Sequence, residues 1–124
     1  MVKLNFESGP FGDCTSNYNV ETDAECVAKF IEEVVKENPG EWGQFCIRAD
    51  NKDDRDICVC SYEKGKVIRK SLNYDAYGAA KIKSIFANGG WSAMSYDIKV
   101  ENFAELPKQD KNEFQLIYWG KLLR

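Results

Sequence analysis

The stretch that decides the fold runs from Thr22 to Asn38 and reads Thr-Asp-Ala-Glu-Cys-Val-Ala-Lys-Phe-Ile-Glu-Glu-Val-Val-Lys-Glu-Asn. Its apolar residues recur at helical spacing and line one stripe, and its charged residues fall on or near the opposite side. The stripe consists of Cys26, Val27, Phe30, Ile31, Val34 and Val35. Thr22 and Glu25 have the spacing of a capping box, and Pro39 disfavours helical backbone at Asn38. The sequence therefore predicts an amphipathic helix over residues 22–38 that packs its stripe on the rest of the chain.

The remainder of the chain has the alternation and the turn residues of β-strands. The predicted strands cover residues 2–7, 17–21, 41–48, 57–62, 66–70, 81–87 and 91–100, and residues 73–80 permit one helical turn. Tight turns between strands exclude a parallel, doubly wound sheet, which needs helical crossovers. We predict an α+β fold with two layers: a mainly antiparallel sheet of about six or seven strands, with the main helix on one face. Residues 1–124 are expected to form a single domain, with residues 108–124 peripheral.

The C-terminal segment permits two interpretations. Asp110 and Glu113 repeat the spacing of a capping box, and Phe114, Ile117 and Tyr118 make a helical stripe. These features favour a C-terminal helix. Residues 116–119 are apolar throughout, however, so a final strand is the alternative.

The predicted hairpin of residues 81–100 permits an argument about register. A three-residue loop, residues 88–90, pairs Ala87 with Trp91 and Ile82 with Tyr96. One face of the hairpin then carries Ile82, Phe86, Met94, Tyr96 and Ile98, and the other carries Lys81, Lys83, Ser95, Asp97 and Lys99. A two-residue turn would mix apolar and charged residues on each face. We therefore predict the three-residue loop, with the apolar face against the helix.

Composition excludes several classes of function. The chain has no histidine, which removes Ser-His-Asp and Cys-His catalysis and histidine-containing zinc sites. Its net charge of −3 argues against non-specific binding of DNA or RNA. It has no apolar run long enough to span a bilayer and no signal-peptide core after Met1, so we expect no membrane association and a cytoplasmic location.

The five cysteines are odd in number and contain no Cys-x-x-Cys pair, which favours reduced thiols over a disulfide framework. Alternation predicts that Cys58 and Cys60 share one face of a strand. Together with Cys14 and Cys46 they could form a four-sulfur zinc site, but such sites usually present paired cysteines in knuckle loops. We favour buried thiols, with redox or thiolate chemistry as the alternative, and we expect no metal and no cofactor.

Carboxylates supply the other candidates for chemistry. Residues 50–56 are rich in Asp, but Arg55 and Ser61 stand where an EF-hand loop needs glycine and glutamate. Asp13, Glu41, Asp75 or Asp97 could meet as an acid–base pair, although nothing in their spacing indicates it. No catalytic residue is predicted.

The candidate binding residues surround Trp91. In the predicted register this side chain lies on the charged face, among Lys83, Ser95, Asp97 and Lys99, and a Trp ringed by charge is typical of a protein-binding hot spot. Trp119, in the apolar C-terminal segment, is the second aromatic candidate. The expected partner is another protein.

Three segments together resemble a family of small uncharacterised proteins of gut bacteria and their phages or mobile elements. The segments are Asp13-Cys14-Thr15-Ser16-Asn17-Tyr18, Glu41-Trp42-Gly43 and Gly89-Gly90-Trp91-Ser92-Ala93-Met94-Ser95-Tyr96. The resemblance covers roughly residues 1–100 and implies an accessory protein that acts by binding. It carries no known activity and no catalytic residue.

These observations predict a non-enzymatic protein-binding accessory protein, with an inhibitor of a host defence protein as one concrete version. One alternative is a small histidine-free enzyme that uses carboxylates or Cys. The other is a self-assembling structural protein, a homo-oligomer that uses residues 116–119 and 122–123 as an isologous patch.

Overall fold

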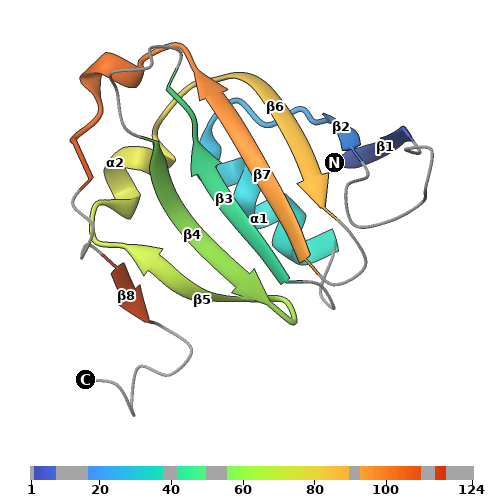
Figure 1. The fold of residues 1–124 in the computed structure, drawn as a ribbon. Helices are drawn as coiled ribbons and strands as arrows, with labels where there is room; N and C mark the ends of the chain where they lie inside the picture. The colour runs from blue at the N-terminus through green and yellow to red at the C-terminus, as the bar shows by residue number, and fades with distance from the viewer. Residues whose placement is uncertain are drawn as a thin grey trace.

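An eight-stranded mixed sheet carries one long helix on one of its faces (Figure 1). The computed structural model describes residues 2–7, 17–37, 42–49, 56–89, 93–109 and 114–116. The strands are β1 (Lys3–Glu7), β2 (Asn17–Glu21), β3 (Trp42–Ile47), β4 (Ile57–Glu63), β5 (Lys66–Ser71), β6 (Ile82–Gly89), β7 (Ala93–Val100) and β8 (Phe114–Leu116). The helices are α1 (Val27–Glu37), α2 (Tyr74–Gly78) and the 3-10 turn η1 (Phe103–Glu105). The coarse prediction of an α+β fold with a mainly antiparallel sheet is confirmed.

The strand order is β1-β2-β6-β7-β3-β4-β5-β8, and the predicted count of six or seven strands was wrong. The five longest strands, in the order β6-β7-β3-β4-β5, form the body of the sheet. Strands β1 and β2 extend the sheet beyond β6, and the short strand β8 extends it beyond β5. Neighbouring strands are antiparallel except β3 and β7, which pair in parallel. Between these two strands the chain forms β4, β5, α2 and β6, so it makes the crossover that a parallel pair requires.

Helix α1 begins at Val27, five residues later than predicted, and the expected capping box does not form. Thr22 Oγ1 instead accepts a hydrogen bond from the backbone N–H of Ala24 at 3.0 Å and donates one to Glu33 at 3.1 Å. Backbone groups at the start of the helix bond to a segment far along the chain. The Val27 N–H donates to the Ala80 carbonyl, and the Glu25 carbonyl accepts from the Ile82 N–H. These tertiary bonds hold residues 22–26 out of the helix.

The apolar stripe of α1 lies against the sheet, as predicted. Val27, Phe30, Ile31 and Val34 are all buried. The ring of Phe30 stands edge-on to Phe45 of β3 and to Tyr96 of β7, with centroids 5.8 and 5.7 Å away. Those two rings stack on each other at 4.9 Å, because the parallel register places Phe45 beside Tyr96. This aromatic cluster fixes the centre of the core at the parallel pair.

The hairpin of β6 and β7 has a different register from the one predicted. Gly89 pairs with Met94 and Phe86 pairs with Asp97, so the three-residue loop over residues 88–90 is wrong. An irregularity between Ile82 and Ser84 shifts the parity along β6, so that Ile82 still faces α1 while Phe86 lies on the opposite face and is 41% exposed. A bulge adds one residue to one strand, which defeats an argument from strict alternation.

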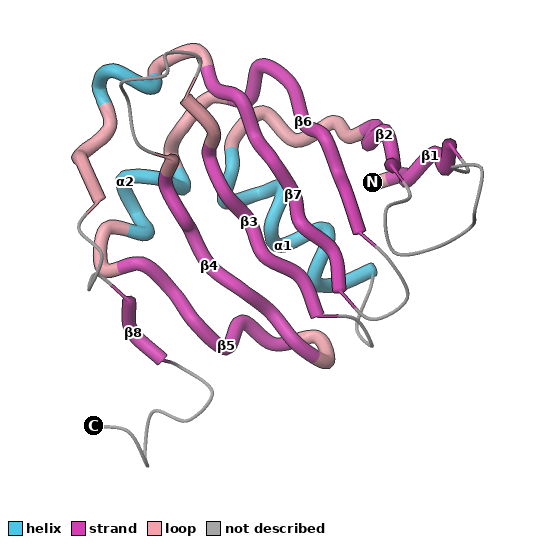
Figure 2. Tube along the Cα trace, in the orientation of Figure 1, coloured by secondary structure: helices cyan, strands magenta, loops and turns pink. Residues whose placement is uncertain are grey.

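The C-terminal helix predicted from residue 110 onward is wrong where the structure describes that segment. Residues 114–116 form β8, which pairs antiparallel with β5 (Figure 2). The strand alternative therefore holds at these three residues, and residues 117–124 lie outside the described chain. The predicted helical turn near residues 73–80 is present as α2. Within the described ranges, no helix is both long and apolar enough to cross a bilayer.

Candidate functional site on the open face of the sheet

The face of the sheet turned away from α1, called the open face here, carries polar side chains at alternate positions of the central strands. Gln44 and Cys46 of β3 lie beside Ser95 and Asp97 of β7, and Cys46 also pairs with Cys58 of β4. Among the residues that the structure describes, no α-helix lies over this face (Figures 1 and 2). Of the side chains that meet on this face, Cys58, Ser95 and Asp97 are partly exposed, whereas Cys46 is buried.

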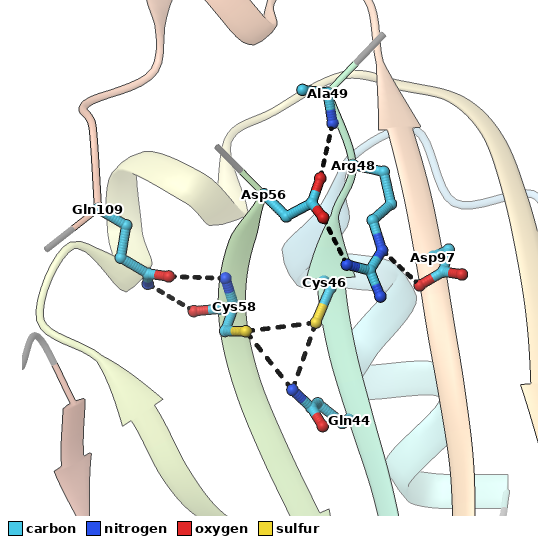
Figure 3. A network of polar contacts seen from close by, with 8 residues as sticks. All are labelled: Gln44, Cys46, Arg48, Ala49, Asp56, Cys58, Asp97 and Gln109. Carbon is cyan, nitrogen blue, oxygen red and sulfur yellow. Dashed lines mark hydrogen bonds and ion pairs between the residues drawn. The ribbon is translucent and has the colours of Figure 1, made fainter. Parts of the chain in front are cut away.

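A bulge in β4 sets the two thiols of the site opposite each other. Phe45 pairs with Cys60 on the side of α1, whereas the next residue, Cys46, pairs with Cys58 on the open face, and Val59 is the extra residue. The prediction that Cys58 and Cys60 share a face was therefore wrong. The four described cysteines are free thiols, and the Sγ atoms of Cys46 and Cys58 lie 3.5 Å apart (Figure 3).

The amide of Gln44 holds both sulfur atoms. Its Nε2 lies 3.4 Å from the Sγ of Cys46 and 3.5 Å from the Sγ of Cys58, and it donates toward each (Figure 3). Cys46 is buried, whereas Cys58 is only partly buried. The pair therefore has one thiol that solvent reaches and one that it does not.

The surroundings separate the acidities of the two thiols. The hydrogen bond from Cys46 is the main cause that lowers the pKa of Cys58 to about 6, against the effect of partial burial, and Gln44, Arg48 and Arg69 lower it further. The same hydrogen bond, together with burial, raises the pKa of Cys46 well above its ordinary value. These surroundings favour ionisation of Cys58 over ionisation of Cys46, because Cys58 is the less buried thiol and its pKa is lowered while that of Cys46 is raised.

An arginine next to the thiols ties three strands together (Figure 3). Arg48 donates through Nε to Asp97 Oδ1 at 2.8 Å and through Nη1 to Asp56 Oδ2 at 2.6 Å. The second oxygen of Asp56 accepts from the backbone N–H of Ala49 at 3.2 Å. Arg48 follows β3, Asp56 precedes β4 and Asp97 lies in β7, so these ion pairs fix the end of the open face.

Gln109 completes the site from a segment far along the chain. Its Oε1 accepts from the Cys58 N–H at 2.8 Å, and its Nε2 donates to the Cys58 carbonyl at 2.7 Å (Figure 3). The same Nε2 also donates to Ser71 Oγ at 3.2 Å. The pairing of β4 with β5 ends at Cys60, which leaves the Cys58 backbone without a strand on that side. The Gln109 amide takes the place of that strand.

The predicted binding residues have mixed outcomes. Ser95 and Asp97 lie on the open face, and Lys83 and Lys99 are exposed beside them. The predicted register, in which Ile82 pairs with Tyr96, would place Lys81 opposite Asp97. Instead Asp97 pairs with Phe86 and bonds Arg48, and Lys81 forms a β-bridge with Cys26. Trp91 and Trp119 lie outside the described residues.

Arg48 and Gln109 were not predicted from the sequence. Cys46 was predicted to meet Cys58 only as part of a four-sulfur zinc site, whereas buried thiols were favoured and redox or thiolate chemistry was the alternative. The four-sulfur zinc site is not assembled in the described part of the chain, because Cys60 is buried on the side of α1, away from Cys46 and Cys58. Burial also raises the pKa of Cys60 to about 12. Cys14 lies outside the described residues. The pair could have been predicted from the cysteines in two successive predicted strands, residues 41–48 and 57–62, which a single loop joins. A scan of family models and searches of curated proteins and of solved structures find no match to this chain.

Proposed function

We propose that this protein acts by binding another protein through the open face of its sheet and catalyses no reaction. The observation that carries the proposal is Phe86, a large aromatic side chain of β6 that lies on that face and is 41% exposed. It pairs with Asp97, whose carboxylate bonds Arg48, so an apolar side chain stands beside a fixed ion pair. Aromatic residues and arginine surrounded by polar groups are typical of protein interfaces.

The charge around Phe86 indicates what kind of surface would fit. Lys99 pairs with Ser84 two residues from Phe86, which places it roughly 7–8 Å away across the strands. Lys83 is exposed on the same part of β6, and Asp97 is already engaged by Arg48. Exposed charges of both signs therefore lie near Phe86, since Glu21 stands two residues from Asn19, the partner of Phe86 on β2. The partner proposed is a protein that presents an apolar side chain surrounded by charged and polar groups.

The carboxylates of the open face support binding over acid–base chemistry. Asp56 and Asp97 both bond the same guanidinium of Arg48. An acid–base pair needs a carboxyl group that is available to exchange a proton with substrate, whereas these two are engaged in ion pairs. The resemblance to small proteins of gut bacteria and their phages or mobile elements narrows the proposal to a host protein, such as a defence protein that is inhibited by binding.

Photo-crosslinking from the open face tests the proposal. Phe86 is replaced by p-benzoylphenylalanine in the full chain, expressed in bacterial cells and irradiated. The matched control carries the same group at Lys36, which is exposed on α1, on the other side of the sheet. We expect a discrete adduct with one host protein from position 86, absent from position 36 and weakened by Lys99→Glu.

The protein identified in this way is then purified and its affinity measured. A hot-spot aromatic contributes about 2 kcal/mol or more, so Phe86→Ser should weaken binding by a factor of about 30. Equal adducts from the two positions, or none from position 86, would contradict the proposal. An adduct with a second copy of this chain would replace it by self-association through the same face.

A further inference from the structure

We propose that Cys46 and Cys58 form a thiol–disulfide exchange site, which reacts with anionic low-molecular-weight disulfides of the glutathione class and closes to a disulfide between β3 and β4. The inference goes beyond protein binding and does not depend on it. It rests on the register of the two strands, on the positions of both sulfur atoms and on the groups around them.

The two thiols are placed for direct bond formation. Residues that oppose each other in antiparallel strands have Cβ atoms about 4.5–5.5 Å apart, and a disulfide needs about 3.5–4.5 Å. The sulfur atoms already point at each other across 3.5 Å, so rotation about the side-chain bonds and a small approach of the strands suffice. The bulge at Val59 interrupts the β3–β4 ladder next to the pair, where such a shift disturbs least.

The site assigns a different role to each thiol. Cys58 is the more exposed, and its pKa of about 6 makes it mostly thiolate at neutral pH. Cys46 is buried, and the hydrogen bond between the two thiols together with burial raises its pKa, which favours its protonated form while Cys58 is ionised. Cys58 is therefore the attacking thiol and Cys46 the resolving thiol. Cys60, buried in the core, has neither the access nor the acidity for this chemistry.

The reaction balances without any further component. The Cys58 thiolate attacks one sulfur of a disulfide RSSR, forms a mixed disulfide Cys58–S–S–R and expels RS⁻. The expelled thiolate takes up the proton that Cys46 loses. Cys46 then attacks the Cys58 sulfur, which forms the Cys46–Cys58 bond and expels a second RS⁻, protonated by solvent. The protein dithiol is oxidised by two electrons, and RSSR is reduced to two RSH.

The charge near Cys58 selects the disulfide. The positive charges of Arg48 and Arg69 both favour the thiolate form of Cys58 and so lower its pKa. Arg48 bonds two aspartates, and Arg69 lies on β5 opposite Ser61 with an exposed side chain. An incoming disulfide with carboxylates, such as oxidised glutathione, gains from this field, whereas a cationic one such as cystamine is repelled.

The test exposes the full-length protein to oxidised glutathione at neutral pH and follows it by intact mass and peptide mapping. The wild type should lose two hydrogen atoms and contain a peptide that joins Cys46 to Cys58. Cys46→Ser should stop at one glutathione on Cys58. Cys58→Ser should react at least about tenfold more slowly at Cys46, as expected for a buried thiol of raised pKa. Cys26→Ser, the matched control, should behave as the wild type.

Other outcomes overturn the inference. A cross-link between another pair of cysteines, or equal reaction of the Cys46→Ser and Cys58→Ser variants, excludes the assigned roles. Equal rates with oxidised glutathione and cystamine exclude the assigned substrate class. If either serine variant does not fold, limiting iodoacetamide on the native wild type decides: Cys58 must be alkylated first among the cysteines of the sheet, and any other order refutes the site.

Discussion

Replacing Gln109 by alanine tests how the C-terminal part of the chain holds the candidate site. The substitution removes three hydrogen bonds, of which two satisfy the Cys58 backbone at 2.8 and 2.7 Å. A net hydrogen bond contributes about 1 kcal/mol, and a backbone group left unpaired in a buried position costs about 1–3 kcal/mol. Since Cys58 is only partly buried, water compensates in part. We expect the free energy of unfolding to fall by about 2–3 kcal/mol.

Gln109→Glu sharpens the same test. A carboxylate still accepts a hydrogen bond from the Cys58 N–H, but its second oxygen faces the Cys58 carbonyl oxygen and cannot donate. The loss should therefore equal or exceed that of the alanine variant, although the glutamate side chain fills the same space. Lys108→Ala, at an exposed neighbouring position, is the control and should change stability by less than about 0.5 kcal/mol.

Urea unfolding with linear extrapolation gives the stabilities, and amide hydrogen exchange at Cys58 gives the local effect. In both Gln109 variants the Cys58 amide should exchange faster than those in the middle of β3. A Gln109→Ala protein that unfolds within about 0.5 kcal/mol of wild type, with an unchanged Cys58 amide, would refute the idea that this side chain substitutes for a strand.

Three further predictions concern the site and the core. The rate of alkylation of Cys58 should rise with pH, with a midpoint near pH 6. The free energy of unfolding should also increase from pH 6 toward 9, because the folded protein has released a proton from Cys58 that the unfolded chain retains. Urea titrations at several pH values measure this slope, and Cys58→Ser should flatten it. Arg48→Met should lower stability by only about 1 kcal/mol at low salt, because the guanidinium and Asp56 are 39% and 44% exposed; no dependence of that loss on added salt would contradict an ionic origin. Gly43→Ala should destabilise by more than about 2 kcal/mol in thermal unfolding, because a Cβ there would stand 2.1 Å from the buried Tyr62 ring, and a wild-type melting temperature would show that the ring can move.

Features of the fold that depend on local periodicity could be predicted from the sequence. The stripe of α1, the β1–β2 hairpin and the strands around Cys46 and Cys58 follow from alternation, helical spacing and turn residues. The start of α1 could not be predicted in this way, because the bonds from Val27 and Ile82 to distant backbone groups replace the local cap at Thr22.

The face of the sheet on which a side chain lies could not be predicted beyond a bulge, because a bulge reverses the alternation of faces along the strand. The irregularity before Ser84 moved Phe86 to the open face, and the bulge at Val59 moved Cys58 there while Cys60 stayed in the core. Nothing in composition or spacing marks these two places. The site also needs contacts over long separations: Gln109 bonds a residue 51 positions earlier in the chain.

The parallel pair at the centre of the sheet has a consequence for the order in which this protein forms during synthesis. Arg48 and Asp97, which join the ends of this pair, are 49 residues apart, and β3 has β7 as one of its two neighbours. Until the ribosome has released β7, the buried face of α1 lacks the strand that carries Tyr96 and Ile98. Contacts of such high contact order form slowly, so the nascent chain exposes part of the apolar stripe of α1 while β4, β5, α2 and β6 are synthesised. C-terminally truncated proteins that end before β7 are therefore expected to aggregate rather than to form a smaller folded domain.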